Sequence, residues 1–230
     1  MKTIGLIGGM SWESTAEYYR VINETVKERC GGLHSSKCIL YSVDFEEIEQ
    51  LQKHGEWDEL TGKMIFTART LERAGADCVV ICTNTMHMMA DEIQEAIDIP
   101  LLHIADAAAD EIKRAKITVI GLLGTLYTME GDFYRTRLRE KHGIEVIIPP
   151  ENDRKKVHDV IYRELCRGTV KEKSKNAFIG IINDLIASGA GGILLGCTEI
   201  PLLIKQEDIT FPVFDTTLIH ARAAVEFALG

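Results

Sequence analysis

Cys197 follows a short apolar run, residues 192–196, and precedes Thr198 and Glu199. An apolar run bounded by glycines predicts a buried strand, and open α/β sheets bind their ligands at the carboxyl ends of strands. Cysteine is suited to acid–base chemistry because helix N–H groups can lower the pKa of its thiol. We therefore expect Cys197 to be a catalytic residue, with the backbone N–H groups that follow it favouring the thiolate.

The chain contains an internal repeat. Residues 75–85 (GADCVVICTNT) align without a gap with residues 189–199 (GAGGILLGCTE). Residues 5–8 likewise echo residues 121–124, and residues 99–102 echo residues 211–214. Three matched blocks in the same order indicate a duplicated α/β unit of about half the chain, and the alignment places Thr83 opposite Cys197.

Two related strand ends suit a reaction that treats both faces of one carbon alike. In racemisation, one group removes the α-proton and another delivers a proton from the opposite face. Cys197 and Thr83 are the candidates for these two positions. Backbone N–H groups after them can hold a substrate carboxylate, and nearby side chains add donors and acceptors to that cradle: Asn84, Thr85, Thr125 and Thr198.

The sequence resembles the aspartate/glutamate racemase family over nearly its whole length. The resemblance rests on residues 5–11 (GLIGGMS) with Ser14 and Thr15, on 83–87 (TNTMH), on 121–125 (GLLGT) and on 196–199 (GCTE). It implies two pseudo-symmetric α/β lobes with the active site in the cleft between them, no cofactor, and Met10 among the substrate-binding residues. We also expect a homodimer.

The first half departs from the family pattern, because Thr83 stands where the family has its first catalytic cysteine. The adjacent Cys82 is expected to face the core, since neighbouring residues of a strand point to opposite faces. An unassisted hydroxyl is far less acidic than a thiol. Thr83 therefore either passes on a proton through water or only shapes the site.

The substrate is left open by the residues. The resemblance implies aspartate or glutamate, yet the motif loops contain no arginine to pair with a side-chain carboxylate. Gln52 is expected to bind the substrate side chain, either a carboxylate or a neutral polar group. Arg163 and Arg167, after Pro150, are the cations that could reach over the site.

Two other functions compete with racemisation. One is a decarboxylase or isomerase of the same superfamily that uses a single cysteine as a one-sided proton donor. The other is a two-lobed amino-acid-binding protein whose chemistry has decayed. His87 lies one helical turn after Thr83, and the sequence allows it to line the cleft or to be structural, whereas we expect His103 and His220 to be structural.

The amino-acid composition limits the classes of partner that the protein is expected to bind. The formal charge of −9 argues against nucleic acid or an anionic membrane as the main partner. No stretch approaches transmembrane length, the N-terminal apolar run is cut by glycines, and the six cysteines show no CxxC pair. We expect a cytoplasmic protein with no metal site and with most of its cysteines, Cys30, Cys38, Cys78 and Cys166 included, as buried packing residues.

Strands alternate with helices through both halves, which predicts an α/β fold with a parallel sheet in each lobe. We expect strands near residues 3–7, 39–43, 78–82 and 100, and again near 118–121, 146–148, 192–196 and 211–213. Ser14 or Thr15 is expected to cap the first helix, and another helix is expected over residues 86–96. The first lobe should cover residues 1–104, completed by the C-terminal helix 215–230, and the second lobe residues 105–214.

Overall fold

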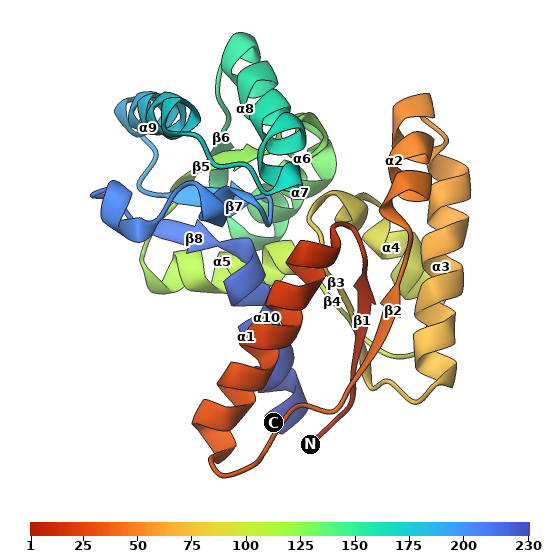
Figure 1. Cartoon of the computed structure of the whole chain (residues 1–230). Coiled ribbons are helices and arrows are strands. Elements are labelled where there is room, and N and C mark those ends of the chain that lie inside the picture. Colours follow the sequence, from red (N-terminus) through yellow and green to blue (C-terminus); the bar gives the residue numbers. More distant parts are fainter. The chain divides into compact units, whose positions relative to one another are not determined.

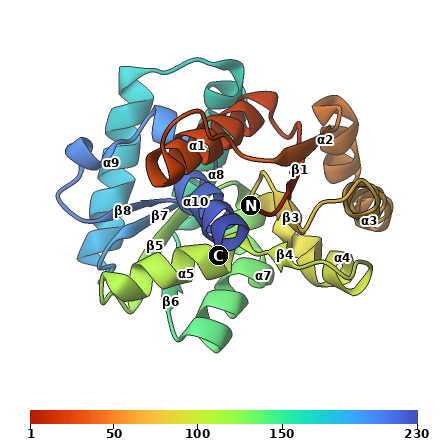
Figure 2. The ribbon, with the colours of Figure 1, turned by 90° about the horizontal axis from the view of Figure 1, so that it is seen from below.

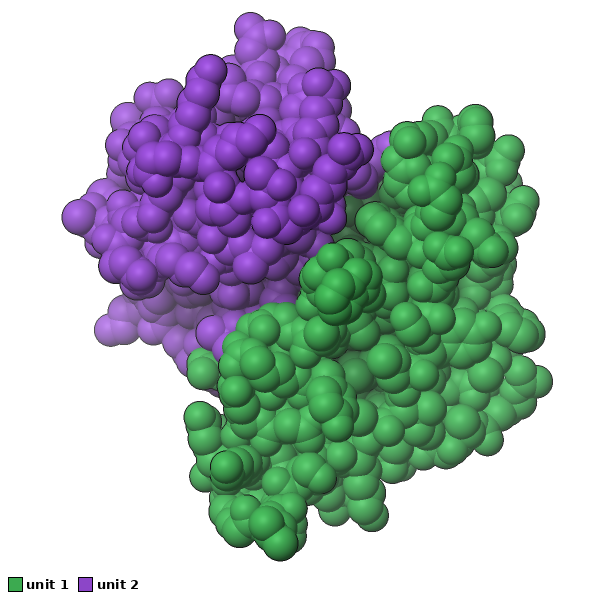
Figure 3. Space-filling model, viewed as in Figure 1, with its two compact units in different colours: residues 1–104, 220–230 green, residues 105–219 purple.

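The computed structural model describes all 230 residues and divides the chain into two compact units (Figure 3). Unit 1 contains residues 1–104 and 220–230, and unit 2 contains residues 105–219. Each unit is built around its own sheet of four parallel strands.

In unit 1 the strand order is β2-β1-β3-β4 (Figure 1). The strands are β1 (Ile4–Gly8), β2 (Cys38–Ser42), β3 (Cys78–Ile81) and β4 (Leu101–Leu102). The helices are α1 (Trp12–Cys30), α2 (Phe45–His54), α3 (Trp57–Arg73) and α4 (Ala90–Glu95), with a 3-10 helix, η1 (Thr85–Met89), before α4.

Every residue of β1 and β3 is buried, as expected for central parallel strands that helices cover on both faces. Figure 1 shows α2 and α3 on one side of this sheet and α1 on the other. One hydrophobic cluster joins strand residues Ile7, Val79 and Ile81 to residues of α2, α3 and η1. The two chain ends meet in this unit, where the Lys2 N–H donates to the Ala228 carbonyl at 2.9 Å (Figure 2).

In unit 2 the strand order is β6-β5-β7-β8. The strands are β5 (Val119–Gly124), β6 (Glu145–Ile147), β7 (Ile193–Gly196) and β8 (Val213–Asp215). The helices are α5 (Ile104–Arg114), α6 (Leu126–Glu130), α7 (Asp132–Thr136), α8 (Glu151–Arg163) and α9 (Glu172–Ala187). A last helix, α10 (Thr216–Leu229), begins in unit 2 and continues from His220 in unit 1. Short segments complete the order: the π-helix η2 (Arg137–Lys141) and the 3-10 helices η3 (Leu165–Arg167), η4 (Ile200–Leu202) and η5 (Gln206–Asp208).

The two sheets have the same strand order when β1 to β4 are matched with β5 to β8. This equivalence is what the internal repeat predicts, and the expected α/β fold of two parallel sheets flanked by helices is confirmed. In both sheets the order reverses between the first and third strands. Open α/β sheets bind their ligands at such a switch point, beside the carboxyl ends of the strands.

Two local expectations were wrong. The residue that caps α1 is Ser11, whose hydroxyl accepts from the Ser14 N–H at 3.3 Å. Ser14 and Thr15 lie inside the helix, and their hydroxyls bind other groups. The single helix expected over residues 86–96 is divided into η1 and α4, and Met89 is both the last residue of η1 and the N-cap of α4.

No helix is long and apolar enough to span a membrane.

Candidate active site

The sequence-predicted site residues cluster at the switch points of the two sheets. In unit 1, Met10 follows β1 and residues 83–85 follow β3, and these two strands are paired. In unit 2, Thr125 follows β5 and residues 197–198 follow β7, which are paired as well. We call these sets the first strand-end group (Met10, Thr83, Asn84 and Thr85, with Gln52 of α2) and the second strand-end group (Thr125, Cys197 and Thr198, with the neighbouring Glu199).

Close backbone contact holds the loop after β1 in place. The Val43 N–H donates to the Gly8 carbonyl at 3.0 Å, and the Gly9 N–H donates to the Thr15 hydroxyl at 2.8 Å. Gly9 has a φ of +93°, and a Cβ there would lie 2.3 Å from the Val43 carbonyl oxygen. Only glycine suits this position, so the loop that carries Met10 follows directly from the glycines of the motif.

Gln52 joins the first strand-end group through α2. Its neighbour Leu51 packs in the same hydrophobic cluster as Met10 and Met86, which brings α2, the β1 loop and η1 together. Gln52 is 6% exposed, and its amide oxygen has no hydrogen-bond partner within the protein. A buried acceptor without a partner is costly, so this oxygen is available to a ligand N–H.

Thr83 is half-buried, and side-chain donors bind the carbonyl before it and its own carbonyl. The Ser14 hydroxyl donates to the Cys82 carbonyl at 3.0 Å, and His87 Nδ1 lies 2.9 Å from the Thr83 carbonyl. Asn84 and Thr85 are buried. Cys82 is fully buried, in agreement with the expectation that it faces the core, and this burial raises the pKa of its thiol far above the usual value.

The second strand-end group is formed where β5 and β7 end side by side, with Gly124 paired to Gly196. A Cβ on Gly124 would lie 2.8 Å from the Gly196 carbonyl oxygen, so the two strands approach closely at this end. Thr125 caps α6, because its hydroxyl accepts from the Thr128 N–H at 3.3 Å. The Thr125 side chain therefore has a structural task besides any contact with a substrate.

Cys197 lies directly after β7 and is 7% exposed. Its thiol donates a hydrogen bond to Glu199 Oε2 at 3.0 Å, and the Thr198 hydroxyl donates to the same oxygen at 2.8 Å. Glu199 itself is 6% exposed. A buried carboxylate thus accepts hydrogen bonds from both neighbouring side chains of the motif.

The expectation that Cys197 has a lowered thiol pKa was wrong. Burial and then the negative charge of Glu199 raise the pKa of the Cys197 thiol well above its usual value. The Glu199 N–H does bind the sulfur and lowers the pKa, as expected of a backbone donor, but its effect is outweighed. Forming the thiolate therefore requires the proton to be transferred to a partner.

The remaining cysteines differ from one another in exposure. Cys78 is buried, and burial raises the pKa of its thiol to about 12. Cys38 and Cys166 are half-buried, and Cys30 is exposed at the end of α1. The expected packing role therefore holds for Cys78 and was wrong for Cys30, because a helix-end position lies beyond the core.

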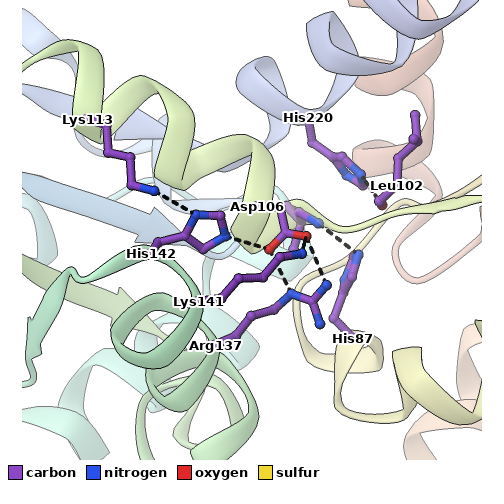
Figure 4. Close-up of polar contacts among 9 residues, drawn as sticks. His87, Leu102, Asp106, Lys113, Arg137, Lys141, His142 and His220 are labelled. Carbon is purple, nitrogen blue, oxygen red and sulfur yellow. Dashed lines mark hydrogen bonds and ion pairs between the residues drawn. The ribbon is translucent and has the colours of Figure 1, made fainter.

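Three buried histidines, His87, His103 and His220, form a cluster in unit 1. The ring centroids of His87 and His103 are 4.7 Å apart, and those of His87 and His220 are 5.5 Å apart. His220 Nε2 donates to the Leu102 carbonyl at 2.7 Å (Figure 4), and its Nδ1 accepts from the Tyr18 hydroxyl at 2.9 Å. Burial lowers the pKa of His220 to about 4, so it is a neutral structural residue.

A charged cluster in unit 2 binds η2 to α5. Asp106 accepts from Arg137 at 2.8 and 2.9 Å, from Lys141 at 2.7 Å, and lies 2.8 Å from His142 Nε2 (Figure 4). Burial raises the pKa of Asp106, but hydrogen bonds from these three side chains outweigh it and hold the pKa far below its ordinary value. Asp106 is thus a permanently charged anchor.

One cavity of about 640 Å³ lies in unit 1, between β2, α2 and α3. Its lining includes Tyr41, Asp44, Glu47, Lys63 and Phe66 and contains no member of the first strand-end group. No group of three or more His, Cys, Asp or Glu side chains is arranged to hold a metal ion. Arg163, one of the two arginines considered for a substrate carboxylate, pairs with Asp159 at 3.3 Å on the exposed side of α8.

Three residues contact the predicted catalytic positions: Glu199, to which sequence reasoning gave no role, Ser14, which it expected as a helix cap, and His87, whose role it left open. All three belong to the motifs that carried the family resemblance. Glu199 is two residues from Cys197, and an acid so close to a candidate base was the available signal. Ser14 and His87 gave no such signal, because their bonds are to backbone carbonyls.

A family model described as Asp/Glu/Hydantoin racemase matches residues 7–224. Among curated proteins, the broad specificity amino-acid racemase RacX of Bacillus subtilis (strain 168) is 24% identical over 99% of this chain and 98% of its own length.

Two solved structures match all of this chain and cover their own chains completely. A candidate Asp/Glu racemase from Yersinia pestis is 57% identical with a TM-score of 0.95. An aspartate racemase homologue from Pyrococcus horikoshii OT3 is 36% identical with a TM-score of 0.87.

Proposed function

Because the chain belongs to the Asp/Glu/Hydantoin racemase family, we propose that it inverts the α-carbon of amino acids by proton transfer at Cys197. The observation that carries the proposal is the Cys197 thiol at the end of β7, buried and hydrogen-bonded to the Glu199 carboxylate. A general acid–base group needs a partner that takes or returns its proton, and Glu199 has the geometry for that task.

The proton steps follow from this pair. Glu199 accepts the thiol proton and leaves a thiolate, which removes the α-proton of the L-enantiomer and becomes a thiol again. The carbanion then takes a proton on its opposite face from water or from the Thr83 hydroxyl. The hydroxide or Thr83 alkoxide left by this delivery takes a proton from the solvent, Glu199 releases its proton to the solvent, and the overall proton count balances.

The remaining members of the two strand-end groups are proposed to hold the substrate. The unpartnered Gln52 amide oxygen is suited to accept from an ammonium group or a polar side chain. Asn84, Thr85 and Thr198 follow strand ends, where backbone N–H groups favour a carboxylate. Met10 would supply apolar contact, and Thr125 would shape the loop after β5 through its cap.

We propose aspartate and glutamate as one substrate class and neutral amino acids as the other, since Gln52 accommodates either. Racemisation assays with a panel of pure L- and D-amino acids test both. Inversion of acidic substrates alone identifies an aspartate/glutamate racemase, inversion of many side chains identifies a broad-specificity enzyme, and inversion of none overturns the proposed function.

Thr83 supports a second candidate, a single-cysteine decarboxylase or isomerase. A hydroxyl is a poor acid and base beside a thiol, and the second face of the substrate then lacks an efficient proton donor. Solvent deuterium at the α-carbon of recovered amino acid supports the racemase. Carbon dioxide release without exchange supports the decarboxylase, and ligand binding that survives alkylation of Cys197, without turnover, supports a binding protein.

A homodimer, a cytoplasmic location and activity without a cofactor complete the proposal. The cysteine and its carboxylate supply acid–base chemistry themselves, so we expect full activity after dialysis against EDTA. Loss of activity that one added metal restores would contradict this part.

A further inference from the structure

The two peptide planes that flank Thr83 are each held by a side-chain hydrogen bond. The carbonyl of Cys82 belongs to the plane before Thr83 and accepts from the Ser14 hydroxyl at 3.0 Å. The carbonyl of Thr83 belongs to the plane after it and binds His87 Nδ1 at 2.9 Å. Since these two planes set φ and ψ of Thr83, the pair of bonds fixes the direction of its Cα–Cβ bond, from which the hydroxyl projects.

Both ring nitrogens of His87 are hydrogen-bonded to the backbone. The Ile104 N–H donates to Nε2 at 3.2 Å, so Nε2 must be unprotonated and Nδ1 must carry the hydrogen that Thr83 accepts. His87 is 2% exposed and Ile104 is fully buried. The imidazole is thus a neutral link between the Thr83 carbonyl and the first residue of α5, with no nitrogen left for acid–base work.

The second repeat lacks this arrangement. Pro201 occupies the position that corresponds to His87 when residues 75–85 are aligned with 189–199, and proline has no side-chain donor. There, the side-chain hydrogen bond is made by the Cys197 thiol itself, which donates to Glu199 Oε2. The two halves therefore control their candidate groups differently, through the backbone at Thr83 and through the side chain at Cys197.

We propose that His87 and Ser14 are positioning residues for Thr83, which aim its hydroxyl, or a water bound to it, at the second face of the substrate. The inference rests on the proposed racemase function and on the role assigned there to Thr83. It predicts that loss of either bond impairs proton delivery on the Thr83 side alone. Proton removal by Cys197 on the other face should be unaffected.

The test is a ratio measured in D2O with a pure L-amino acid that the parent protein processes. Deuterium in recovered L-substrate reports proton removal and return by Cys197, and deuterated D-product reports delivery on the Thr83 side. The ratio of inversion to exchange is independent of the amount of folded protein, so a loss of stability alone does not change it.

We expect His87→Leu and Ser14→Ala to lower this ratio about tenfold or more, because displacing a reacting group by about 1 Å can cost about a hundredfold in rate. His87→Asn keeps an N–H donor near the place of Nδ1 and should stay within about threefold of the parent. His220→Leu is the matched control, since His220 lies in the same buried cluster and is bonded to Tyr18 and Leu102 instead.

An unchanged ratio in both His87→Leu and Ser14→Ala would overturn the inference while the proposed function stands. An equal fall of the ratio in His220→Leu would also overturn it, because the effect would then come from the core as a whole. Absence of exchange and inversion in the parent with every amino acid would overturn the proposed function and this inference together.

Discussion

The Cys197 thiol holds its proton because burial and the Glu199 carboxylate both disfavour a second negative charge. A thiol in this state is a poor nucleophile, but the group that can accept its proton is already hydrogen-bonded to it. We therefore propose that Cys197 and Glu199, joined by this hydrogen bond, act as one unit in proton transfer at the end of β7.

Replacing the thiol tests this unit directly. We expect Cys197→Ala to lower the racemisation rate by about a hundred- to ten-thousand-fold, the usual loss when a general acid–base group is removed. Circular dichroism should show an unchanged fold, because the alanine loses only one sulfur atom beside β7. Cys30→Ala, a substitution of the exposed cysteine at the end of α1, is the control. An alanine variant within a few-fold of the parent would exclude Cys197 as the base.

Glu199→Gln should change thiol reactivity and turnover in opposite directions. Removing the negative charge lowers the pKa of the Cys197 thiol, so its alkylation by iodoacetamide at pH 8 should become faster. Racemisation should become slower, because the acceptor of the thiol proton is lost. Peptide mass spectrometry distinguishes Cys197 from the other five cysteines, and slower alkylation in the variant would show that Glu199 serves instead to activate the thiol.

The sequence predicted Cys197 correctly as a residue placed at a strand end, because apolar runs, glycines and the repeat all act locally. The sequence did not predict the raised pKa of the Cys197 thiol, because this pKa depends on the orientation of the Glu199 carboxylate and on the burial of the sulfur. A sequence motif gives the residue types of a site, whereas the rotamers and the burial of its side chains are set by packing against the rest of the fold. The same limit hid the bonds that Ser14 and His87 make to backbone carbonyls.

At the scale of secondary-structure elements, hydrogen bonds of buried histidine side chains connect helices with strands. His220 connects α10 with Tyr18 of α1 and with the Leu102 carbonyl of β4. Its folded pKa of about 4 lies below the unfolded value of about 6.5. The unfolded state therefore binds more protons as the pH falls, and the stabilisation is present above about pH 6.5 and is lost towards pH 4.

This linkage predicts an acid-sensitive fold. We expect His220 alone to lower the free energy of unfolding by about 2 kcal/mol between pH 7 and pH 5. Urea unfolding at the two pH values, in the parent and in His220→Gln, measures the difference. The variant should lose less stability on acidification, whatever its stability at pH 7. An identical pH dependence in both proteins would show that His220 does not titrate on unfolding.

The order of the elements was predictable where hydrophobic pattern and local turn chemistry agree. The alternation of strands and helices and the repeat together predicted two parallel sheets, and both sheets have the same order. The single helix expected at 86–96 was wrong because the His87 N–H donates to the Asn84 carbonyl, three residues back, which gives η1 a tighter turn before α4 begins. Likewise, the π-helical η2 was not predictable, since three of the side chains that bind Asp106 come from η2 and the residue after it.

At the scale of the whole molecule, the family membership predicted from four motifs is confirmed by a family match over residues 7–224. Whole-chain likeness extends to a relative with only 24% identity, which is typical of a fold that accommodates different substrates. Thr83 distinguishes the two halves chemically within that common architecture. A duplicated fold with one thiol and one hydroxyl should treat the two enantiomers of its substrate unequally.

Deuterium uptake from D2O into each pure enantiomer tests this central claim most directly. We predict that α-proton exchange in the L-substrate outpaces net inversion, that the D-enantiomer exchanges slowly, and that Thr83→Cys speeds the D-to-L direction by supplying the second thiol. Equal exchange from both enantiomers in the parent protein would contradict the claim, because it would show that a competent base already acts on the second face.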